Sequence, residues 1–341
     1  MPTVKPKVLL TDSYFPSVVS FLNEHVDVSI VDTNSPQSNP QDLSKLLFGF
    51  DAVMCKLNSR FSEAVFAQSP QLKMIANVAV GYDNVDVSDA IKYGVLVSNT
   101  PGVLNETVAD LTFALVLACG RRLIEADRYA RSGAWHDFDF HLLAGTDIYN
   151  KCLGIIGFGR IGQAVARRAL GFGMKVIYNQ RSQADASVEA ELKARYVDFD
   201  TLLAESDYLV VMCPLTDATH HLISEAQLAK MKKTAFVINT ARGAIIDEKA
   251  LVRALQNKII AGAGLDVFEH EPSICDELKP LDNVVLSPHV GSSTLATREQ
   301  MALMAAQSIV DAFGGKRPSN LLNPQVWPQF CEYFKLANAA K

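Results

Sequence analysis

The stretch LGIIGFGRIG, residues 153–162, joins an apolar run to three glycines spaced as GxGxxG. The apolar residues predict a buried strand, and the following IGQAVARRAL has the spacing of an amphipathic helix. In such a turn Gly157 permits the tight bend, Gly159 lets a ligand approach the backbone, and Gly162 lets the helix pack on the strand. The N–H groups at the helix start favour anions such as a pyrophosphate. The stretch therefore predicts a dinucleotide site in a doubly wound α/β fold.

Outward from this turn, short β-branched runs alternate with helical patterns in both directions. This alternation predicts parallel sheets with crossover helices. The expected strands form an early group and a late group, at 7–12, 26–32, 51–55, 74–80 and 95–99, and at 152–159, 175–179, 207–214, 235–243, 262–268 and 283–291. We predict an α/β protein of two doubly wound parallel-sheet domains, Rossmann-like and flavodoxin-like, with the active site in the cleft between them.

Two long helices suggest how the domains are connected. A helix is expected from Glu106 to about Arg131, after an N-cap at Asn105, and its apolar character on several sides requires burial between domains or against another subunit. The last expected helix, Leu295–Phe313, has no strand after it and would return the chain to the first domain. A chain of 341 residues favours two domains. We predict a discontinuous substrate domain of residues 1–103 and 293–341, and a dinucleotide-binding domain of residues 104–292.

The composition excludes several classes of partner. A net charge of −5 gives no basic surface for nucleic acid. The apolar run from Leu111 to Cys119 is about half the length of a membrane span. The N-terminus lacks the pattern of a signal peptide, and the six cysteines are scattered among apolar residues as reduced, buried thiols would be. We expect a cytoplasmic protein with no nucleic-acid or membrane partner.

The strand after the glycine turn indicates the type of dinucleotide. NAD enzymes usually place an acid at its end, where it binds the ribose 2′-hydroxyl. Here KVIYN is followed by Gln180, Arg181 and Ser182, and the first carboxylate is Asp185. Arg181 can pair with a 2′-phosphate, and Gln180 and Ser182 can hydrogen-bond to it. We predict that NADPH is preferred; the alternative is a solvated loop arginine in a protein that uses NADH.

Three polar residues follow late strands, where ligands bind in open α/β sheets. Arg242 lies in NTARGAIID, Glu271 lies in DVFEHEP at the end of the strand expected at 262–268, and His289 lies in LSPHVG. Reduction of a 2-oxo acid needs a cation for the substrate's oxygens, an acid that protonates the carbonyl oxygen, and a group that keeps this acid protonated. Arg242, His289 and Glu271 fit these roles in that order. Taken singly, each also fits a solvated or packed loop residue.

Seven segments, read together, are similar to one family: VGYDNVDV (80–87), NTPGVLNETVADLTFALVL (99–117), LGIIGFGRIG, PLTDATHHLI (214–223), MKKTAFVINTARGAIIDEKAL (231–251), GAGLDVFEHEP (262–272) and NVVLSPHVGSST (283–294). The chain resembles the D-isomer-specific 2-hydroxyacid dehydrogenases, nearest to the NADPH-dependent glyoxylate/hydroxypyruvate reductases that also reduce 2-ketogluconate. The resemblance implies that Arg242, Glu271 and His289 are catalytic.

The same resemblance implies the ligand contacts. The substrate carboxylate would rest on the backbone of Val80 and Gly81, with Arg242 and His289 as further substrate contacts. Asp266 would hold the nicotinamide amide or, alternatively, cap a turn. The implied cofactor contacts include residues 180–182 and the glycine turn. The full set, besides residues 180–182, is Thr107, Gly157, Phe158, Gly159, Arg160, Ile161, Gly162, Cys213, Pro214, Thr219, Thr240, Ala241, Arg242, Asp266, His289 and Gly291.

Other polar residues are expected to have structural or peripheral roles. The segment HDFDFHLL (136–143) has metal-ligand residue types but is expected to be a loop, in which Leu142 and Leu143 shape substrate access, and we predict no metal site. His220, His221 and His270 are expected at a helix start or on the surface. Lys56 is expected to contact a substrate tail or to be a solvated lysine at a strand end.

The predicted function is the NADPH-dependent reduction of glyoxylate, hydroxypyruvate or 2-ketogluconate to D-2-hydroxy acids, with His289 as the general acid. The alternatives are a D-3-phosphoglycerate dehydrogenase, a D-lactate dehydrogenase, or a non-catalytic NAD(H)-sensing protein like the C-terminal-binding corepressors. The complete Arg242, Glu271 and His289 set favours an enzyme. The helix from Glu106 and the apolar residues after it resemble the family's subunit interface, so a C2 homodimer is expected.

Overall fold

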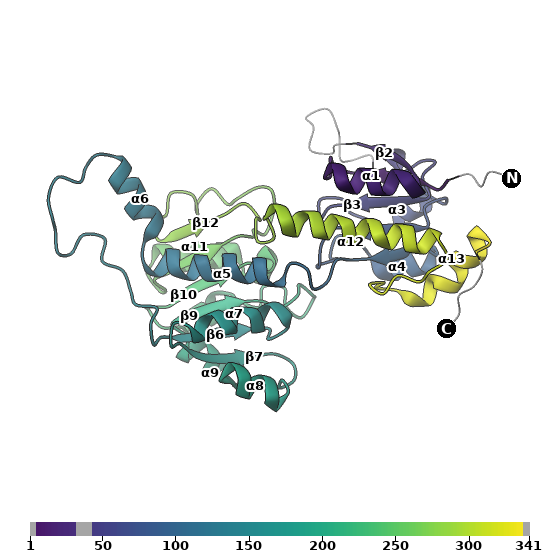
Figure 1. Cartoon of the computed structure of the whole chain (residues 1–341). Helices are drawn as coiled ribbons and strands as arrows, with labels where there is room; N and C mark the ends of the chain where they lie inside the picture. The colour runs from purple at the N-terminus through teal and green to yellow at the C-terminus, as the bar shows by residue number, and fades with distance from the viewer. Residues whose placement is uncertain (1–4, 32–42, 337–341) are drawn as a thin grey trace. The chain divides into compact units, whose positions relative to one another are not determined.

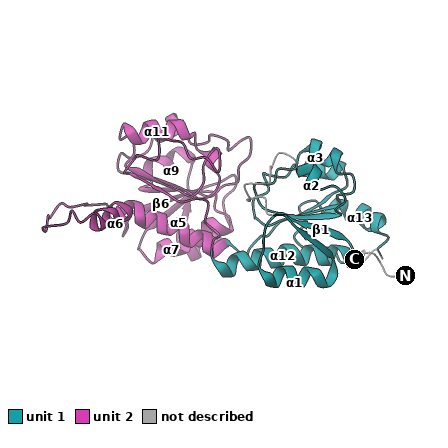
Figure 2. Ribbon diagram, turned by 90° about the horizontal axis from the view of Figure 1, so that it is seen from above, with its two compact units in different colours: residues 1–104, 294–341 teal, residues 105–293 magenta. Residues whose placement is uncertain are grey.

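The computed structural model describes residues 5–31 and 43–336 and divides the chain into two compact units. Unit 1 comprises residues 1–104 and 294–341, and unit 2 comprises residues 105–293 (Figure 2). Each unit contains one sheet, and every strand pair within either sheet is parallel. The predicted class of two doubly wound parallel-sheet domains is therefore confirmed. Among the described residues, no helix has the length and apolarity to cross a membrane.

The sheet of unit 2 has seven strands in the order β12-β11-β10-β9-β6-β7-β8. The strands are β6 (Cys152–Ile156), β7 (Lys175–Asn179), β8 (Ala194–Tyr196), β9 (Tyr208–Val211), β10 (Phe236–Asn239), β11 (Gly262–Leu265) and β12 (Val284–Leu286). The chain moves one way from β6 to β8 and the other way from β9 to β12. Such a reversal leaves an opening at the carboxyl ends of the central strands, where ligands of doubly wound sheets bind.

Helices cover both faces of this sheet (Figure 2). One face carries α5 (Asn105–Gly120) and α7 (Arg160–Leu170), and the other carries α9 (Phe199–Glu205), α10 (Glu225–Leu228) and α11 (Glu248–Gln256), while α8 (Ala186–Leu192) lies next to β8. Because both faces are covered, the central strands are continuous apolar runs rather than alternating ones. All five residues of β6 are buried.

The prediction of one long helix from Glu106 to Arg131 is wrong in one respect, because the segment forms two helices. α5 ends at Gly120, and α6 (Leu123–Arg131) begins after Arg122, whose φ of 51° is left-handed. A side chain at position 120 would collide with the Tyr208 hydroxyl, so only glycine lets the end of α5 approach the sheet there. The Gly120 carbonyl accepts a hydrogen bond from the N–H of Thr146. This contact closes the 26-residue excursion that contains α6.

Unit 1 has five strands in the order β2-β1-β3-β4-β5, the flavodoxin-like arrangement. They are β1 (Lys7–Leu10), β2 (Asp27–Ile30), β3 (Ala52–Cys55), β4 (Met74–Asn77) and β5 (Leu96–Ser98); the expected end of the second strand at Asp32 lies outside the described residues. One face packs against α1 (Pro16–His25), α12 (Leu295–Phe313) and α13 (Trp327–Phe334), and the other against α2 (Leu43–Leu46), α3 (Glu63–Gln68) and α4 (Val87–Lys92).

The C-terminal segment is part of the core of unit 1 rather than an irregular tail. α13 was not expected, yet Trp327 and Phe330 are buried in it. Ahead of α13, the Asn323 side chain accepts a hydrogen bond from the Val97 N–H at 2.9 Å and donates one to the Val95 carbonyl at 2.8 Å. A single buried amide thus fixes the segment that leads into α13 to the edge strand β5.

Candidate active site

The glycine turn has the geometry that its spacing predicts, with a different reason for each glycine. Gly157 has a φ of 90°, and a Cβ there would lie 2.7 Å from the backbone nitrogen of Cys213. A Cβ at Gly162 would collide with the carbonyl oxygen of Gly157. At Gly159 a Cβ would meet no atom within 4 Å, so this glycine is adjacent to open space rather than to packed protein. That open side is where a pyrophosphate would approach the backbone.

The start of α7 offers unengaged donors to such an anion. Its N-cap residue is Gly159, which has no side chain to accept hydrogen bonds from the first N–H groups. No acidic residue lies in the first turn. The first N–H groups of a helix have no partner within the helix and carry its partial positive charge. The backbone of Arg160 and Ile161 at this end of α7 therefore fits a dinucleotide pyrophosphate.

Phe158, in the middle of the turn, has a structural role. Its ring is buried and stacks on Tyr178 with 4.1 Å between ring centroids. Its N–H donates to the Gln180 side-chain oxygen at 3.0 Å, and the Gln180 amide nitrogen donates to the Ser182 carbonyl at 2.8 Å. A neutral amide thus connects the glycine turn to the end of β7, at the position where an acid is usual in NAD enzymes. Arg181 and Ser182 are exposed beside it.

The structure brings Arg242, Glu271 and His289 to the carboxyl ends of the neighbouring strands β10, β11 and β12. His289 Nδ1 lies 2.7 Å from Glu271 Oε2. The positive charge of Arg242 is close enough to lower the pKa of Glu271. Residues 47 positions apart in the chain therefore form one electrostatic unit.

Backbone contacts hold these three residues in place. The second oxygen of Glu271 accepts a hydrogen bond from the Phe268 N–H at 3.0 Å. His289 has a left-handed φ of 52°, and its N–H donates to the Asp266 carbonyl at 2.8 Å. A side chain in place of Gly243 would collide with the backbone of Phe268, so glycine there allows the turn of Arg242 to pack against the loop of Glu271. Backbone contacts within and between the three loops thus position Arg242, Glu271 and His289.

The charge state of Glu271 follows from its surroundings. Burial raises the pKa of Glu271. Four interactions lower it by more: the hydrogen bond from His289, the charge of His289, the hydrogen bond from the Phe268 N–H and the charge of Arg242. The pKa therefore lies below the usual glutamate value. An ionised carboxylate only accepts hydrogen bonds. Nδ1 of His289 must then carry a proton, which leaves Nε2 as the nitrogen available to a ligand: it accepts a hydrogen bond when the ring is neutral and donates one when the ring is an imidazolium.

Asp266 is buried, and it already binds the loop that carries His289. Its Oδ1 accepts from the Ser287 hydroxyl at 2.6 Å and the Val290 N–H at 2.9 Å, and its Oδ2 accepts from the Gly291 N–H at 2.8 Å. A carboxylate has about four acceptor positions, so one is left for a ligand. The turn-capping role weighed for Asp266 is therefore present in the structure.

The remaining cofactor candidates lie in the loops after β9 and β10 and on α5. Thr219 donates its hydroxyl hydrogen to the Pro214 carbonyl at 2.7 Å, which closes the turn after Cys213. The Thr240 hydroxyl lies 2.7 Å from that of Thr112 on α5. Thr107 and Ala241 are half-buried, and Gly291 is buried.

Sequence reasoning missed Asn239, which shapes the turn that carries Arg242. Its side-chain nitrogen donates to the Arg242 carbonyl at 2.9 Å, and its oxygen accepts from the Ala241 N–H at 3.0 Å. The available signal was a polar residue at the end of an otherwise apolar strand, four positions before a glycine. Asn is suited to this because one side chain supplies both a donor and an acceptor.

In unit 1, Val80 and Gly81 follow β4 in a loop whose carbonyl groups are engaged. Asn99 donates to the Val80 carbonyl at 2.8 Å, and Asn77 donates to the Gly81 carbonyl at 2.9 Å. Among the described residues, neither the Val80 nor the Gly81 N–H donates a hydrogen bond. Two successive free N–H groups with fixed carbonyls suit a small anion.

The other residues weighed from the sequence have definite places. Lys56 forms an ion pair with Asp12 at 2.7 Å, and residues 136–141 are exposed while Leu142 and Leu143 are half-buried. His220 and His221 do not begin a helix, which corrects that expectation: they lie in a turn four residues before α10. This turn hydrogen-bonds to the 3-10 turn after Arg242, since the His221 N–H donates to the Ala244 carbonyl.

Comparisons with known proteins agree on one family. Residues 113–291 match the family model of the "D-isomer specific 2-hydroxyacid dehydrogenase, NAD binding domain". Glyoxylate reductases of Thermococcus onnurineus and Korarchaeum cryptofilum are 46% and 44% identical to the chain, over 95% of it and 97% of each relative.

Solved structures give the same result. A glyoxylate reductase from Paecilomyes thermophila superimposes with a TM-score of 0.84 at 32% identity, over 95% of this chain and 100% of the other. An NADPH-dependent glyoxylate/hydroxypyruvate reductase from Sinorhizobium meliloti, in complex with NADP and malonate, has a TM-score of 0.83 at 31% identity, over 94% and 97% of the chains. The chain therefore belongs to the D-isomer-specific 2-hydroxyacid dehydrogenases, oxidoreductases that use a nicotinamide cofactor.

Proposed function

We propose that this protein reduces small 2-oxo acids to D-2-hydroxy acids with NADPH, and that glyoxylate and hydroxypyruvate are its best substrates, with 2-ketogluconate as a further one. The observation that carries the proposal is the 2.7 Å contact between His289 and Glu271, next to Arg242, in a unit with a dinucleotide turn. The relatives named glyoxylate reductase support the substrate class. A sensor that never turns over substrate has no use for a proton donor fixed in this way.

The residues divide the chemistry among them. Arg242 binds the carboxylate and polarises the carbonyl oxygen of the substrate. His289 holds a proton at Nε2 and donates it to that oxygen as negative charge develops, while Glu271 accepts the hydrogen bond from Nδ1 and stabilises the imidazolium. The N–H groups of Val80 and Gly81 bind the substrate carboxylate. Bound NADPH supplies the hydride that the substrate's C2 accepts.

The unit 2 residues assigned to NADPH are those at the carboxyl ends of its strands. Gly157, Gly159 and the start of α7 would hold the pyrophosphate, and Arg181 with Ser182 would bind the 2′-phosphate. The open side of Gly159 supports this fit, because no atom of the described residues lies within 4 Å of a Cβ placed there. The NADP complex of the Sinorhizobium meliloti relative also supports it.

The substrate assignment is tested with the purified protein, NADPH and a panel of 2-oxo acids. We expect the highest kcat/KM with glyoxylate or hydroxypyruvate, measurable turnover of 2-ketogluconate, and a D-configured product by chiral chromatography. Pyruvate and 3-phosphohydroxypyruvate report on the D-lactate and D-3-phosphoglycerate alternatives. A preference for either of these, or an L product, would contradict the proposal.

The role of His289 has a separate test. His289→Gln should lower kcat/KM by at least about a hundredfold, because a positioned general acid contributes that much or more. NADPH binding, followed by cofactor fluorescence, should be unchanged. His270→Gln is the matched control, since His270 is exposed and lies directly before Glu271 in the same loop. Full turnover in His289→Gln would remove histidine from the mechanism.

We also infer that the protein is a C2 homodimer. α6 and the segment after it project from the body of unit 2 (Figure 1), and Trp135, Phe138 and Phe140 are 62%, 83% and 84% exposed there. A monomer rarely exposes aromatic side chains in such a cluster. A second copy of the chain would cover them.

A cytoplasmic location is proposed on the state of the cysteines. All six are free thiols, and four of them are buried. Burial raises the pKa of the Cys213 thiol to about 11, so that even this half-buried cysteine beside the glycine turn remains protonated and unreactive near neutral pH. Free, unreactive thiols are typical of a reducing compartment.

A further inference from the structure

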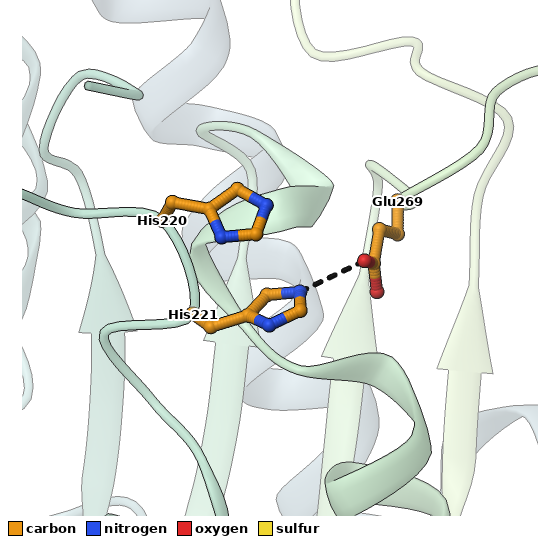
Figure 3. A group of neighbouring side chains, drawn as sticks. All are labelled: His220, His221 and Glu269. Carbon is orange, nitrogen blue, oxygen red and sulfur yellow. Dashed lines mark hydrogen bonds and ion pairs between the residues drawn. The ribbon is translucent and has the colours of Figure 1, made fainter. Parts of the chain in front are cut away.

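Three metal-ligating side chains converge in unit 2 outside the residues assigned to hydride and proton transfer. His220 and His221 lie in the turn after β9, and Glu269 lies in the loop after β11. One ligand atom from each lies within 4.8 Å of the others. Figure 3 shows the two imidazoles stacked and the Glu269 carboxylate turned toward His221. The ring centroids are 4.0 Å apart, and His221 Nε2 lies 2.8 Å from Glu269 Oε1.

We propose that His220, His221 and Glu269 bind one divalent cation of the zinc class, with water as the fourth ligand. Two imidazoles and one carboxylate are the ligand types that zinc takes from proteins, at about 2.0–2.2 Å from the metal. Tetrahedral ligands at that distance are about 3.4 Å apart. The His221–Glu269 pair must open slightly from 2.8 Å, and the exposed His220 ring must move inward by little more than an ångström.

The backbone around the three ligands is fixed, which favours a site that is already formed. The N–H of His220 donates to the Thr216 carbonyl, and the N–H of His221 donates to the Ala244 carbonyl, at 2.9 and 2.8 Å. His221 has a left-handed φ of 50°. The second oxygen of Glu269 accepts from the Glu248 N–H, the first residue of α11, at 3.3 Å. Movement is needed mainly in the His220 side chain.

The local charge also suits a cation. Glu248 is buried beside Glu269, whose side chain accepts a hydrogen bond from the Glu248 N–H. A second carboxylate therefore adds negative potential behind the ligand set. A cation would relieve the proximity of these acids, as metal ions commonly do for clustered carboxylates.

A cation here would join two loops that, among the described residues, share the hydrogen bond between His221 and Glu269. The turn of His220 and His221 continues from Cys213 and Pro214, and Glu269 precedes Glu271 by two residues. The cation would brace these loops without touching the reacting atoms. Its expected effect is on thermal stability, and this inference does not depend on the proposed substrate.

The test measures metal binding directly. Protein stripped with a chelator is titrated with Zn²⁺ by calorimetry and with Co²⁺ by visible absorption, which reports tetrahedral ligation. We expect one ion per chain, bound at least about tenfold more weakly in His220→Gln and in Glu269→Gln, because each removes a ligand. Zn²⁺ should raise the Tm of the wild type but not of His220→Gln.

Matched variants locate the ion. His220 is exposed, so His220→Gln should keep the fold, which circular dichroism of the stripped protein checks. His270→Gln and the double variant His136→Gln/His141→Gln should bind as the wild type does. Equal binding in wild type and His220→Gln, loss of binding in His289→Gln instead, or no tetrahedral Co²⁺ spectrum would each overturn the proposal.

Discussion

At the end of β7, two adjacent residues set the charge that a bound dinucleotide would meet. Gln180 is neutral and already hydrogen-bonded to Phe158, and Arg181 is exposed. We expect Arg181→Ala to raise the KM for NADPH about tenfold to a hundredfold and to leave that for NADH nearly unchanged, because one charge-assisted hydrogen bond is lost. Gln180→Asp should shift preference toward NADH, since a carboxylate repels a 2′-phosphate.

The control for that prediction is Arg195→Ala. Arg195 is also exposed and lies in the neighbouring strand β8, but it pairs with Glu205 at 2.7 Å. Its removal should change the KM of neither cofactor. An equal rise in both KM values on removing Arg181 would mean that this residue does not read the 2′-phosphate.

Glu271 connects the candidate site to the pH dependence of folding. Its pKa is lowered in the folded protein, so it stabilises the fold above the usual glutamate pKa, and this contribution is lost as pH falls through the lowered value. We expect Glu271→Gln to be less stable than the wild type near neutral pH, with the difference shrinking below about pH 4. Urea unfolding at a series of pH values measures this. Parallel stability curves would contradict it.

At the scale of elements, the sequence predicted what local periodicity determines. Every expected strand is present, and the helix Leu295–Phe313 has the expected bounds. The strands are shorter than expected because the polar residues after them leave the sheet: the run 235–243 is a strand only to Asn239, where side-chain hydrogen bonds begin the turn of Arg242. The three loop residues Arg242, Glu271 and His289 were predicted from the sequence, and they lie after the neighbouring strands β10, β11 and β12.

The elements that escaped prediction depend on contacts distant in sequence. β8 is three residues long and carries Arg195, so neither length nor polarity marks it as a strand. The break between α5 and α6 depends on Tyr208, 88 residues away from Gly120, and no local pattern contains that collision. The cluster of His220, His221 and Glu269 was missed for the same reason: only the parallel order of β9, β10 and β11 brings its two loops together.

The strand–turn–helix element of β6 and α7 allows its packing and its ligand role to be separated. We expect Gly162→Ala to destabilise the protein by about 1–3 kcal/mol, because the new methyl group collides with the Gly157 carbonyl in a packed element. Gly159→Ala meets open space, so its stability should be near that of the wild type while its affinity for NADPH falls. Thermal unfolding and cofactor titration of the two variants measure the difference. Loss of stability in Gly159→Ala, with affinity kept, would reverse the roles assigned to the two glycines.

At the scale of the whole molecule, the exposed aromatic residues after α6 make a prediction about assembly. Light scattering after size-exclusion chromatography should give twice the 37.2 kDa mass of one chain. The double variant Phe138→Glu/Phe140→Glu should be monomeric, because burying two new carboxylates in an interface costs more than a marginal contact supplies.

The matched control for assembly is Phe48→Glu. Phe48 is 78% exposed, comparable with Phe138, but it lies in unit 1, away in sequence from α6 and its following segment. This variant should remain a dimer, which distinguishes a specific interface from a general effect of surface charge. The monomeric variant also tests whether assembly is needed for reduction. Every residue assigned to proton transfer belongs to one chain, so the monomer should still reduce the substrate. Its Tm should be lower, because the interface is lost. A monomeric wild type, or a Phe138→Glu/Phe140→Glu dimer, would show that these aromatic residues do not hold two copies together.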